Sequence, residues 1–168
     1  IRKLKYTQEF EDNLNIIKTP SVTKCSKKPY TLISFKPDYK RMGLNGLTKD
    51  MLNLLKRRVY DLAAVTDKSV KVKYNNEIVP IKSFIQYVDL YVGDKSTTSR
   101  VHEEGNERWE YVVCMAPKEE FTQVSFVNGI FTCKGGKHVE YILNQFVRKM
   151  TAFIKQKKKI DVKPNTIK

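Results

Sequence analysis

The lysines near the end of the chain are the side chains best suited to bind a polyanion. Residues 148–168 carry eight basic side chains against one acid, Asp161, and so supply half of the net charge of +14. A lysine ammonium is a flexible point charge that suits phosphate better than base edges. The sequence therefore predicts a sequence-neutral contact with a nucleic-acid backbone, made by the densest group, Lys155, Lys157, Lys158 and Lys159. The alternative is a solvated helix end, because lysine there also complements the helix dipole.

Two other groups have the composition of a reactive site but not its spacing. Gly135-Gly136-Lys137 lacks the earlier glycine of a Walker A loop, and His138 stands where that loop needs a hydroxyl residue. The pairs Glu103-Glu104 and Glu119-Glu120 are consecutive, and consecutive side chains on a strand point to opposite faces. We therefore predict neither a phosphate loop nor a catalytic carboxylate pair.

Cysteine and histidine give no metal-binding pattern in the sequence. Cys25, Cys114 and Cys133 are too far apart for a Cys-x-x-Cys motif, and such thiols fit a reducing compartment. His102 and His138 are far from each other and lack a cysteine or acid at ligand spacing. We predict no metal site. No apolar run approaches the ~20 residues that span a bilayer, so no membrane partner is expected.

The lysines must be presented by the elements of the second half of the chain. Residues 109–116 and 121–127 are rich in aromatic and β-branched side chains and predict two strands. Gly129, Gly135 and Gly136 follow, where a chain leaving a strand must turn or adopt positive φ. A long helix is then predicted by apolar residues at three- and four-residue steps, namely Val139, Ile142, Leu143, Phe146, Met150, Phe153 and Ile154. A sheet covered by this helix is an α+β layer.

The first half contains a second set of elements. Residues 28–38 alternate apolar and polar side chains and predict a half-buried strand that Pro37 ends. Thr48 is placed to cap a helix whose basic triplet, residues 56–58, is expected to face solvent rather than DNA. Residues 70–81 predict a hairpin that turns at Asn75-Asn76, and Ser83 precedes a short amphipathic helix. Rising polarity over residues 92–108 indicates a domain boundary, although residues 100–104 are compatible with an edge strand.

The run from Ser125 to Tyr141 resembles a known family signature. It is similar to the strand-to-helix pattern of the transducer region of type IIA DNA topoisomerases, Ser-Phe-Val-Asn-x-Ile-x-Thr-x-x-Gly-Gly-x-His-Val-x-Tyr. Residues 28–38, 55–63 and 87–91 also resemble segments of the ATPase domain of that family, in the family's order. The resemblance covers residues 5–159 and indicates a fragment of a eukaryotic-type DNA topoisomerase II.

The resemblance implies a fold and a domain division. The fold class is α+β: a partial GHKL-type ATPase sheet and helix segment, followed by a ribosomal-protein-like α/β sandwich with one long amphipathic helix. Residues 1–92 would be the C-terminal part of the GHKL ATPase domain. Residues 93–168 would be the transducer domain, incomplete at its C-terminus.

The resemblance also implies an activity for the parent enzyme. That enzyme would be a nuclear homodimer that uses ATP and Mg²⁺ to pass one DNA duplex through another. This segment would couple the ATP gate to the DNA gate, bind no cofactor itself and be inactive alone. Its partners would be double-stranded DNA and the remainder of the parent chain, and its lysine-rich helix end would face DNA. A rival of another class is a stand-alone, sequence-neutral nucleic-acid-binding module with a translation-protein-like fold.

Overall fold

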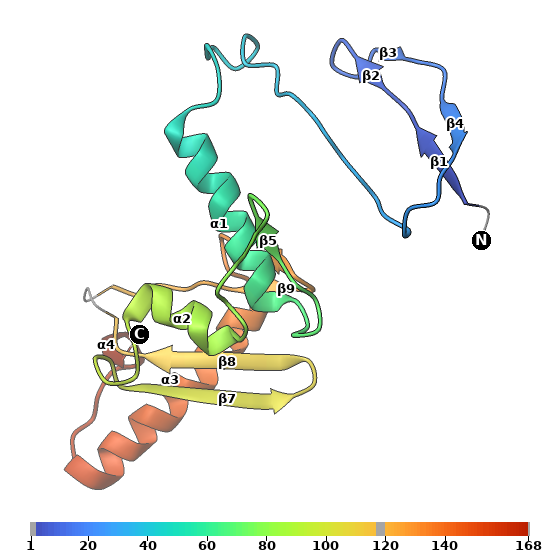
Figure 1. Ribbon diagram of the computed structural model, residues 1–168. Helices are drawn as coiled ribbons and strands as arrows, with labels where there is room; N and C mark the ends of the chain where they lie inside the picture. The colour runs from blue at the N-terminus through green and yellow to red at the C-terminus, as the bar shows by residue number, and fades with distance from the viewer. Residues whose placement is uncertain (1–2, 117–119, 168) are drawn as a thin grey trace. The chain divides into compact units, whose positions relative to one another are not determined.

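The computed structural model describes residues 3–116 and 120–167, and it divides into two compact units, residues 1–51 and 52–168. Lys168, which the sequence analysis counted in the basic tail, and Glu119 lie outside the described residues. Within these ranges none of the helices combines the length and apolar character needed to cross a bilayer. Helices and strands are mixed along the chain (Figure 1).

The first unit is a long hairpin followed by an extended stretch. Strand β1 (Leu4–Thr7) pairs antiparallel with β4 (Ser21–Lys24), and β2 (Phe10–Glu11) pairs with β3 (Ile16–Ile17) nearer the turn. Every residue of these four strands is exposed. The strands are therefore held by their backbone ladder, without a hydrophobic core of their own.

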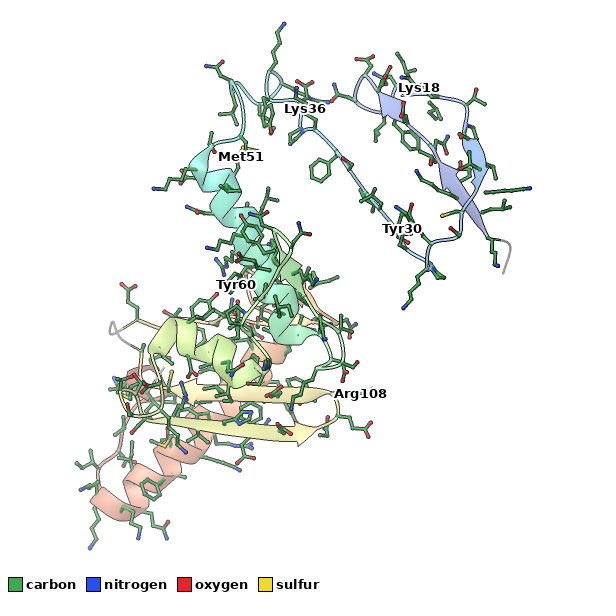
Figure 2. All side chains as sticks on the ribbon, viewed as in Figure 1. Lys18, Tyr30, Lys36, Met51, Tyr60 and Arg108 are labelled. Carbon is green, nitrogen blue, oxygen red and sulfur yellow. The ribbon has the colours of Figure 1, made fainter. Side chains whose placement is uncertain are left out.

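The strand predicted over residues 28–38 is wrong in this structure. Leu32, Ile33 and Phe35 are 77%, 82% and 75% exposed, and residues 28–38 carry no strand assignment. Figure 2 labels Tyr30 and Lys36 along this extended stretch, where the side chains stand clear of any neighbouring strand. The physical reason is that a strand needs a hydrogen-bonded neighbour, and no described residue supplies one to this stretch.

Helix α1 (Lys49–Val65) confirms the helix predicted after Thr48. The backbone N–H of Met51 donates to Thr48 Oγ1 at 3.2 Å, which satisfies one of the free amides of the first turn. Asp50 in that turn complements the positive end of the helix dipole.

The next two elements match the sequence closely. Strands β5 (Lys73–Tyr74) and β6 (Glu77–Ile78) form the predicted hairpin, and Asn75 and Asn76 both adopt positive φ in its turn. Such φ values at both central residues are those of a type I′ turn, which suits the twist of a hairpin. Ser83 Oγ then accepts the Gln86 N–H at 3.3 Å and caps α2 (Phe84–Val92).

Two more hairpins precede the long helix. Strands β7 (Arg100–Asn106) and β8 (Trp109–Cys114) pair with an irregularity between Glu104 and Asn106. Strands β9 (Phe126–Val127) and β10 (Ile130–Phe131) follow. The strand predicted over 109–116 ends two residues early, and the one predicted over 121–127 is wrong except at its last two residues. Gln123 is held through its side chain, and Ser125 through both its side chain and one backbone bond, which its carbonyl accepts from the Thr132 N–H at 2.8 Å.

The long helix α3 (Lys137–Lys158) confirms the predicted apolar stripe, and a short helix α4 (Pro164–Ile167) follows it. The Trp109 ring of β8 lies 6.0 Å from the Tyr141 ring of α3, so the β7–β8 hairpin lies against this helix (Figure 1). The centre of the second unit is a small buried cluster of Ala63, Val79, Ile81 and Tyr87. Val124 and Phe126 pack against it.

Candidate functional site

The lysine group lies at the C-terminal end of α3. Lys155, Lys157, Lys158 and Lys159 are all exposed. The helix runs unbroken to Lys158, and Lys159 ends it in the left-handed conformation, with φ 57° and its N–H donating to Lys155 O at 3.0 Å. At 1.5 Å per residue, the 22 residues of α3 span about 33 Å. The helix therefore presents a cluster of positive charge far from its own N-terminus.

One of these lysines already has a partner. Lys155 Nζ lies 2.8 Å from Asp161 Oδ1, and this hydrogen bond raises the pKa of Lys155 above its ordinary value. Both side chains are largely exposed, so solvent screens the pair and its contribution to stability is small. Asp161 nevertheless offsets the positive charge of Lys155. No such ion pair offsets the charges of Lys157, Lys158 and Lys159 among the described residues.

The glycines of the signature lie in left-handed backbone conformations. Gly129 has φ 78° and, with Asn128 at φ 50°, makes the two-residue turn between β9 and β10. Gly135 has φ 70° and Gly136 has φ 149°, immediately before α3 begins. A Cβ on Gly136 would lie only 3.2 Å from the His138 ring, so this position also favours a residue that has no side chain. Their role as a hinge stays a prediction.

A polar cluster fixes the start of α3 to the β9–β10 hairpin. Ser125 Oγ donates to Gln123 Oε1 at 2.7 Å, and Thr132 Oγ1 donates to Ser125 O at 2.9 Å. The two hydroxyl oxygens lie 2.6 Å apart, and His138 Nε2 is within hydrogen-bond distance of both, 3.1 Å from Ser125 Oγ and 3.2 Å from Thr132 Oγ1. Gln123 Nε2 in turn donates to Cys133 O at 3.1 Å. Sequence analysis assigned no role to His138.

A buried carboxylate joins α1 to α2. Asp61 is 3% exposed, and its Oδ1 accepts a hydrogen bond from the Tyr87 hydroxyl at 2.6 Å. Arg58 Nη1 lies 3.2 Å from Asp61 Oδ2. Burial, together with the hydrogen bond to Asp61, raises the pKa of Tyr87 well above its ordinary value, so this hydroxyl keeps its proton at neutral pH. Tyr91 OH lies 2.9 Å from the same hydroxyl.

The basic triplet of α1 rests on aromatic rings. The guanidinium carbons of Arg57 and Arg58 each lie 4.8 Å from the centre of the Phe131 ring in β10. Lys56 Nζ lies 5.9 Å from the Tyr60 ring. The side chains are exposed, as the sequence predicts, but the cation–π contacts of Arg57 and Arg58 hold α1 against the β9–β10 hairpin. A shallow hollow of about 250 Å³ lies between Arg58, Asp61 and Gly129.

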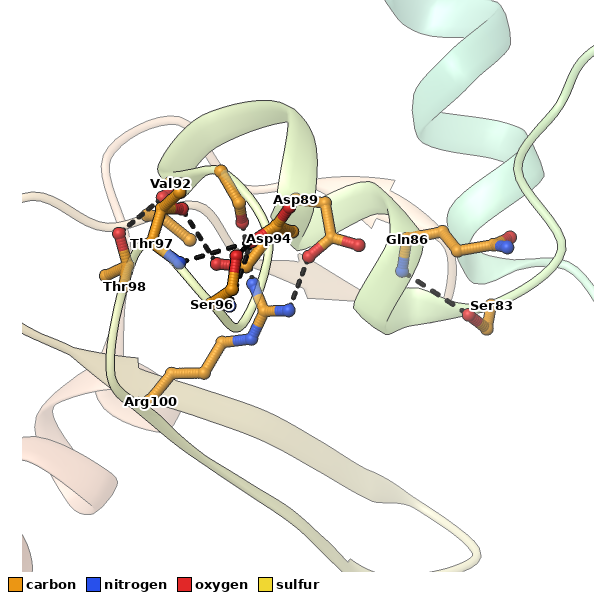
Figure 3. Close-up of polar contacts among 10 residues, drawn as sticks. Ser83, Gln86, Asp89, Val92, Asp94, Ser96, Thr97, Thr98 and Arg100 are labelled. Atoms are coloured by element: carbon orange, nitrogen blue, oxygen red, sulfur yellow. Dashed lines mark hydrogen bonds and ion pairs between the residues drawn. The ribbon is translucent and has the colours of Figure 1, made fainter.

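The polar stretch after α2 is tightly bonded. Arg100, with a side chain only 5% exposed, pairs with Asp89 at 2.5 Å and donates to Gly93 O at 2.9 Å. Asp94 Oδ1 accepts the N–H of Ser96, and Thr98 Oγ1 donates to Val92 O at 2.6 Å (Figure 3). These bonds tie the start of β7 to the end of α2. The domain boundary at 92/93 remains a prediction.

Cross-strand pairing gives His102 an acidic neighbour that the sequence did not indicate. His102 Nε2 lies 3.0 Å from Glu110 Oε1, and Glu104 lies directly opposite Glu110 in the ladder. One ligand atom from each of the three lies within 4.8 Å of the others. Residues 102 and 110 are eight apart, so only the hairpin register could have revealed their proximity.

The comparisons with known proteins agree with the signature. The DNA gyrase B family model matches residues 83–168, just over half of the chain. The chain belongs to the DNA gyrase B family. It is 42% identical to DNA topoisomerase 2 of Arabidopsis thaliana and 40% identical to DNA topoisomerase 2-beta of Gallus gallus, in each case over 99% of its own length. These matches cover 12% and 10% of the two relatives, so the chain spans about a tenth of their length.

Two solved structures of relatives confirm the predicted fold class of this chain. The ATPase region of Saccharomyces cerevisiae topoisomerase II matches with a TM-score of 0.83 at 35% identity, over 96% of this chain and 42% of that one. The ATPase and transducer domains of DNA topoisomerase II from Balamuthia mandrillaris match with a TM-score of 0.75 at 31% identity, over 92% and 39% of the two chains. The resemblance to eukaryotic-type topoisomerase II and the α+β fold are thereby confirmed.

Proposed function

We propose that this chain is a working segment of an ATP-dependent type II DNA topoisomerase, an isomerase that changes DNA topology by passing one duplex through another. The relatives described above are named DNA topoisomerase 2, and the matching structures are titled as its ATPase region or its ATPase and transducer domains. These names favour this function over a stand-alone nucleic-acid-binding module. The segment couples the ATP gate to the DNA gate.

The observation that carries this proposal is the construction of α3. Its N-terminus is held to the β9–β10 hairpin by the cluster around Ser125 and His138, while its far end presents four exposed lysines. A single unbroken helix between these points converts a small rotation at the hairpin into a large displacement of the tip. The hinge role of Gly129, Gly135 and Gly136 belongs to this lever.

The tip contacts the DNA backbone. Lysine ammonium groups neutralise phosphates without reading base edges, and counterion release then makes the affinity fall steeply with salt. Binding at Lys155, Lys157, Lys158 and Lys159 is therefore sequence-neutral. Lys155 contributes least, because Asp161 offsets its charge.

ATP and Mg²⁺ act elsewhere in the parent enzyme. The Gly135 N–H already donates to Thr132 O at 2.9 Å, so it is not a free amide for a phosphate. We therefore place no cofactor on this segment, and the isolated segment hydrolyses no ATP. The parent is a nuclear homodimer, and the remainder of its chain supplies the nucleotide and cleavage machinery.

Salt-dependent DNA binding tests the lysine tip. Duplex binding by the 168-residue chain is measured by fluorescence anisotropy across a salt series, before and after replacing Lys155, Lys157, Lys158 and Lys159 by alanine. Each lost phosphate contact should flatten the slope of log affinity against log salt by about 0.9, and by at most about 3.6 in total. The matched control replaces four exposed lysines of the same unit elsewhere, Lys68, Lys71, Lys73 and Lys82. Equal losses in both variants would show that net charge, not the tip, binds DNA.

A further inference from the structure

A buried charge in a small core requires an explanation. Asp61 is 3% exposed in a unit whose core consists of few side chains, and burying a carboxylate is costly unless it is paired and hydrogen-bonded. Its partners come from two places, Arg58 one turn earlier on α1 and Tyr87 on α2. Breaking such a pair leaves an uncompensated buried charge, so its geometry is strongly enforced.

The contacts of Asp61 continue into a closed ring of five side chains. Arg58 lies 4.8 Å from the Phe131 ring, and the Phe131 ring lies 5.7 Å from the Phe126 ring. Phe126 packs edge-on against Tyr87 at 5.9 Å, and the Tyr87 hydroxyl returns to Asp61 at 2.6 Å. We call this set of residues the Asp61 ring.

The Asp61 ring joins three separate elements. Two members lie on α1, one on α2, and two on the β9–β10 hairpin. A single contact between two elements allows them to pivot, whereas a closed ring of contacts fixes all three orientations together. The hairpin in the ring is the same one to which Ser125, Thr132 and His138 attach the start of α3.

We propose that the Asp61 ring is the joint that sets the orientation of the β9–β10 hairpin, and thereby of α3, from the position of α1. Asp61, Tyr87 and Arg58 are positioning residues in this joint: they transmit orientation and touch neither nucleotide nor DNA. This inference rests on the proposed function, because the orientation it transmits is the one that couples the two gates.

The decisive variant is Tyr87→Phe in the full-length parent enzyme. It keeps the ring packing on Phe126 but removes the hydroxyl that Asp61 accepts from. We expect DNA-independent ATP hydrolysis to stay within about twofold of wild type, while the ATP consumed per strand-passage event rises at least about threefold. The matched control is Tyr141→Phe, which removes the hydroxyl of an exposed tyrosine outside the Asp61 ring and should leave the ratio unchanged.

Two further variants separate positioning from simple stability. Asp61→Asn removes the charge that both Arg58 and Tyr87 bind and should raise the same ratio, and the double variant Asp61→Asn/Tyr87→Phe should show less than the sum of the two single effects, because both variants weaken the Asp61–Tyr87 contact. Arg58→Lys keeps the charge but loses the planar group over Phe131, so it should also raise the ATP consumed per strand-passage event. If instead every activity fell in proportion to lost folded enzyme and the ratio stayed constant, the joint would be structural only and the proposal would be overturned.

A structural measurement keeps the joint testable apart from the activity. In Tyr87→Phe the Thr132 amide, which donates to Ser125 O at 2.8 Å, should exchange its hydrogen at least about tenfold faster, while Tyr141→Phe leaves it protected. Unchanged exchange would refute the joint even if DNA binding behaves as proposed. Conversely, an unaltered salt slope in the lysine variant would refute the DNA contact while faster exchange still supports the joint.

Discussion

Lys155 and Lys158 are one helical turn apart but differ in their surroundings. Lys155 forms an ion pair with Asp161 at 2.8 Å, and Lys158 extends beyond that pair. Sequence analysis grouped them as equivalent, because spacing shows which residues are charged but not which acid folds back onto them. The structure predicts unequal shares in DNA binding.

Replacing Asp161 by asparagine should strengthen DNA binding. The change frees Lys155 for phosphate, so the salt slope should steepen by as much as about 0.9. Anisotropy titrations across a salt series measure both the affinity for DNA and the slope of its dependence on salt. Glu107→Gln, at an exposed turn, removes the same charge without releasing a lysine, and its slope should match wild type. Identical slopes for the two variants would mean that Asp161 does not restrain Lys155.

Because of Tyr87, the free energy of unfolding should fall as the pH rises above about 10. Burial raises its pKa above the ordinary value near 10, so the folded chain keeps a proton that the unfolded chain loses. This contribution is complete below about pH 10 and declines above it by about 1.4 kcal/mol per pH unit. Urea unfolding at about pH 9 and about pH 11 should show a smaller decline for Tyr87→Phe than for wild type. Tyr141→Phe should behave like wild type, and an equal decline in all three would contradict the assignment.

At the scale of elements, the turn before α3 depends on one backbone conformation. Gly135 adopts φ 70°, where a Cβ costs about 1 to 2 kcal/mol. Gly135→Ala should therefore lower the free energy of unfolding by about that amount in urea titrations. Gly105→Ala is the control, since a Cβ there meets only ordinary contacts and its φ is not positive. Equal effects at both sites would show that loss of glycine itself, not the left-handed turn, is responsible.

Local signals predicted the helices and turns well, because their causes are local. The cap at Thr48, the turn at Asn75-Asn76 and the cap at Ser83 each depend on side chains within a few residues. The strands were predicted less well. Residues 28–38 and 121–125 have strand-like composition, but a strand also needs a neighbour that composition cannot supply.

In the candidate site, too, the features with local causes were predicted and those that depend on distant residues were not. The lysine tip and the glycine turns were visible as residue types in sequence, whereas the Asp61 ring was not. Its members are spread from Arg58 to Phe131, and no periodicity links an acid in a helix stripe to a distant tyrosine. Helical spacing gave no signal either, because it places Asp61 on the side of Arg57 and Arg58, where an acid is ordinarily a solvated partner of a basic side chain.

At the scale of the whole molecule, the exposed apolar stretch of the first unit points to the remainder of the parent chain. Leu32, Ile33 and Phe35 are 77%, 82% and 75% exposed, an arrangement that costs solubility when left in water. If the chain is part of the proposed parent enzyme, this stretch would be a strand that pairs with neighbours in the parent's ATPase sheet. In the 168-residue chain this stretch is extended but unpaired, and its apolar side chains are exposed.

Ile33→Lys should have opposite effects in the chain and in its parent. In the 168-residue chain it places a charge on an exposed apolar stretch, so the onset concentration of aggregation in light scattering should rise severalfold. In the parent, where a paired sheet would bury this position, the same charge should lower thermal stability because an unpaired buried lysine is costly. Ser34→Lys, at the neighbouring polar position whose side chain would point to the opposite face of a strand, should be close to neutral in the parent. A parent that tolerates Ile33→Lys as well as Ser34→Lys would show that the stretch stays exposed there too, and that its apolar side chains serve some surface other than the sheet.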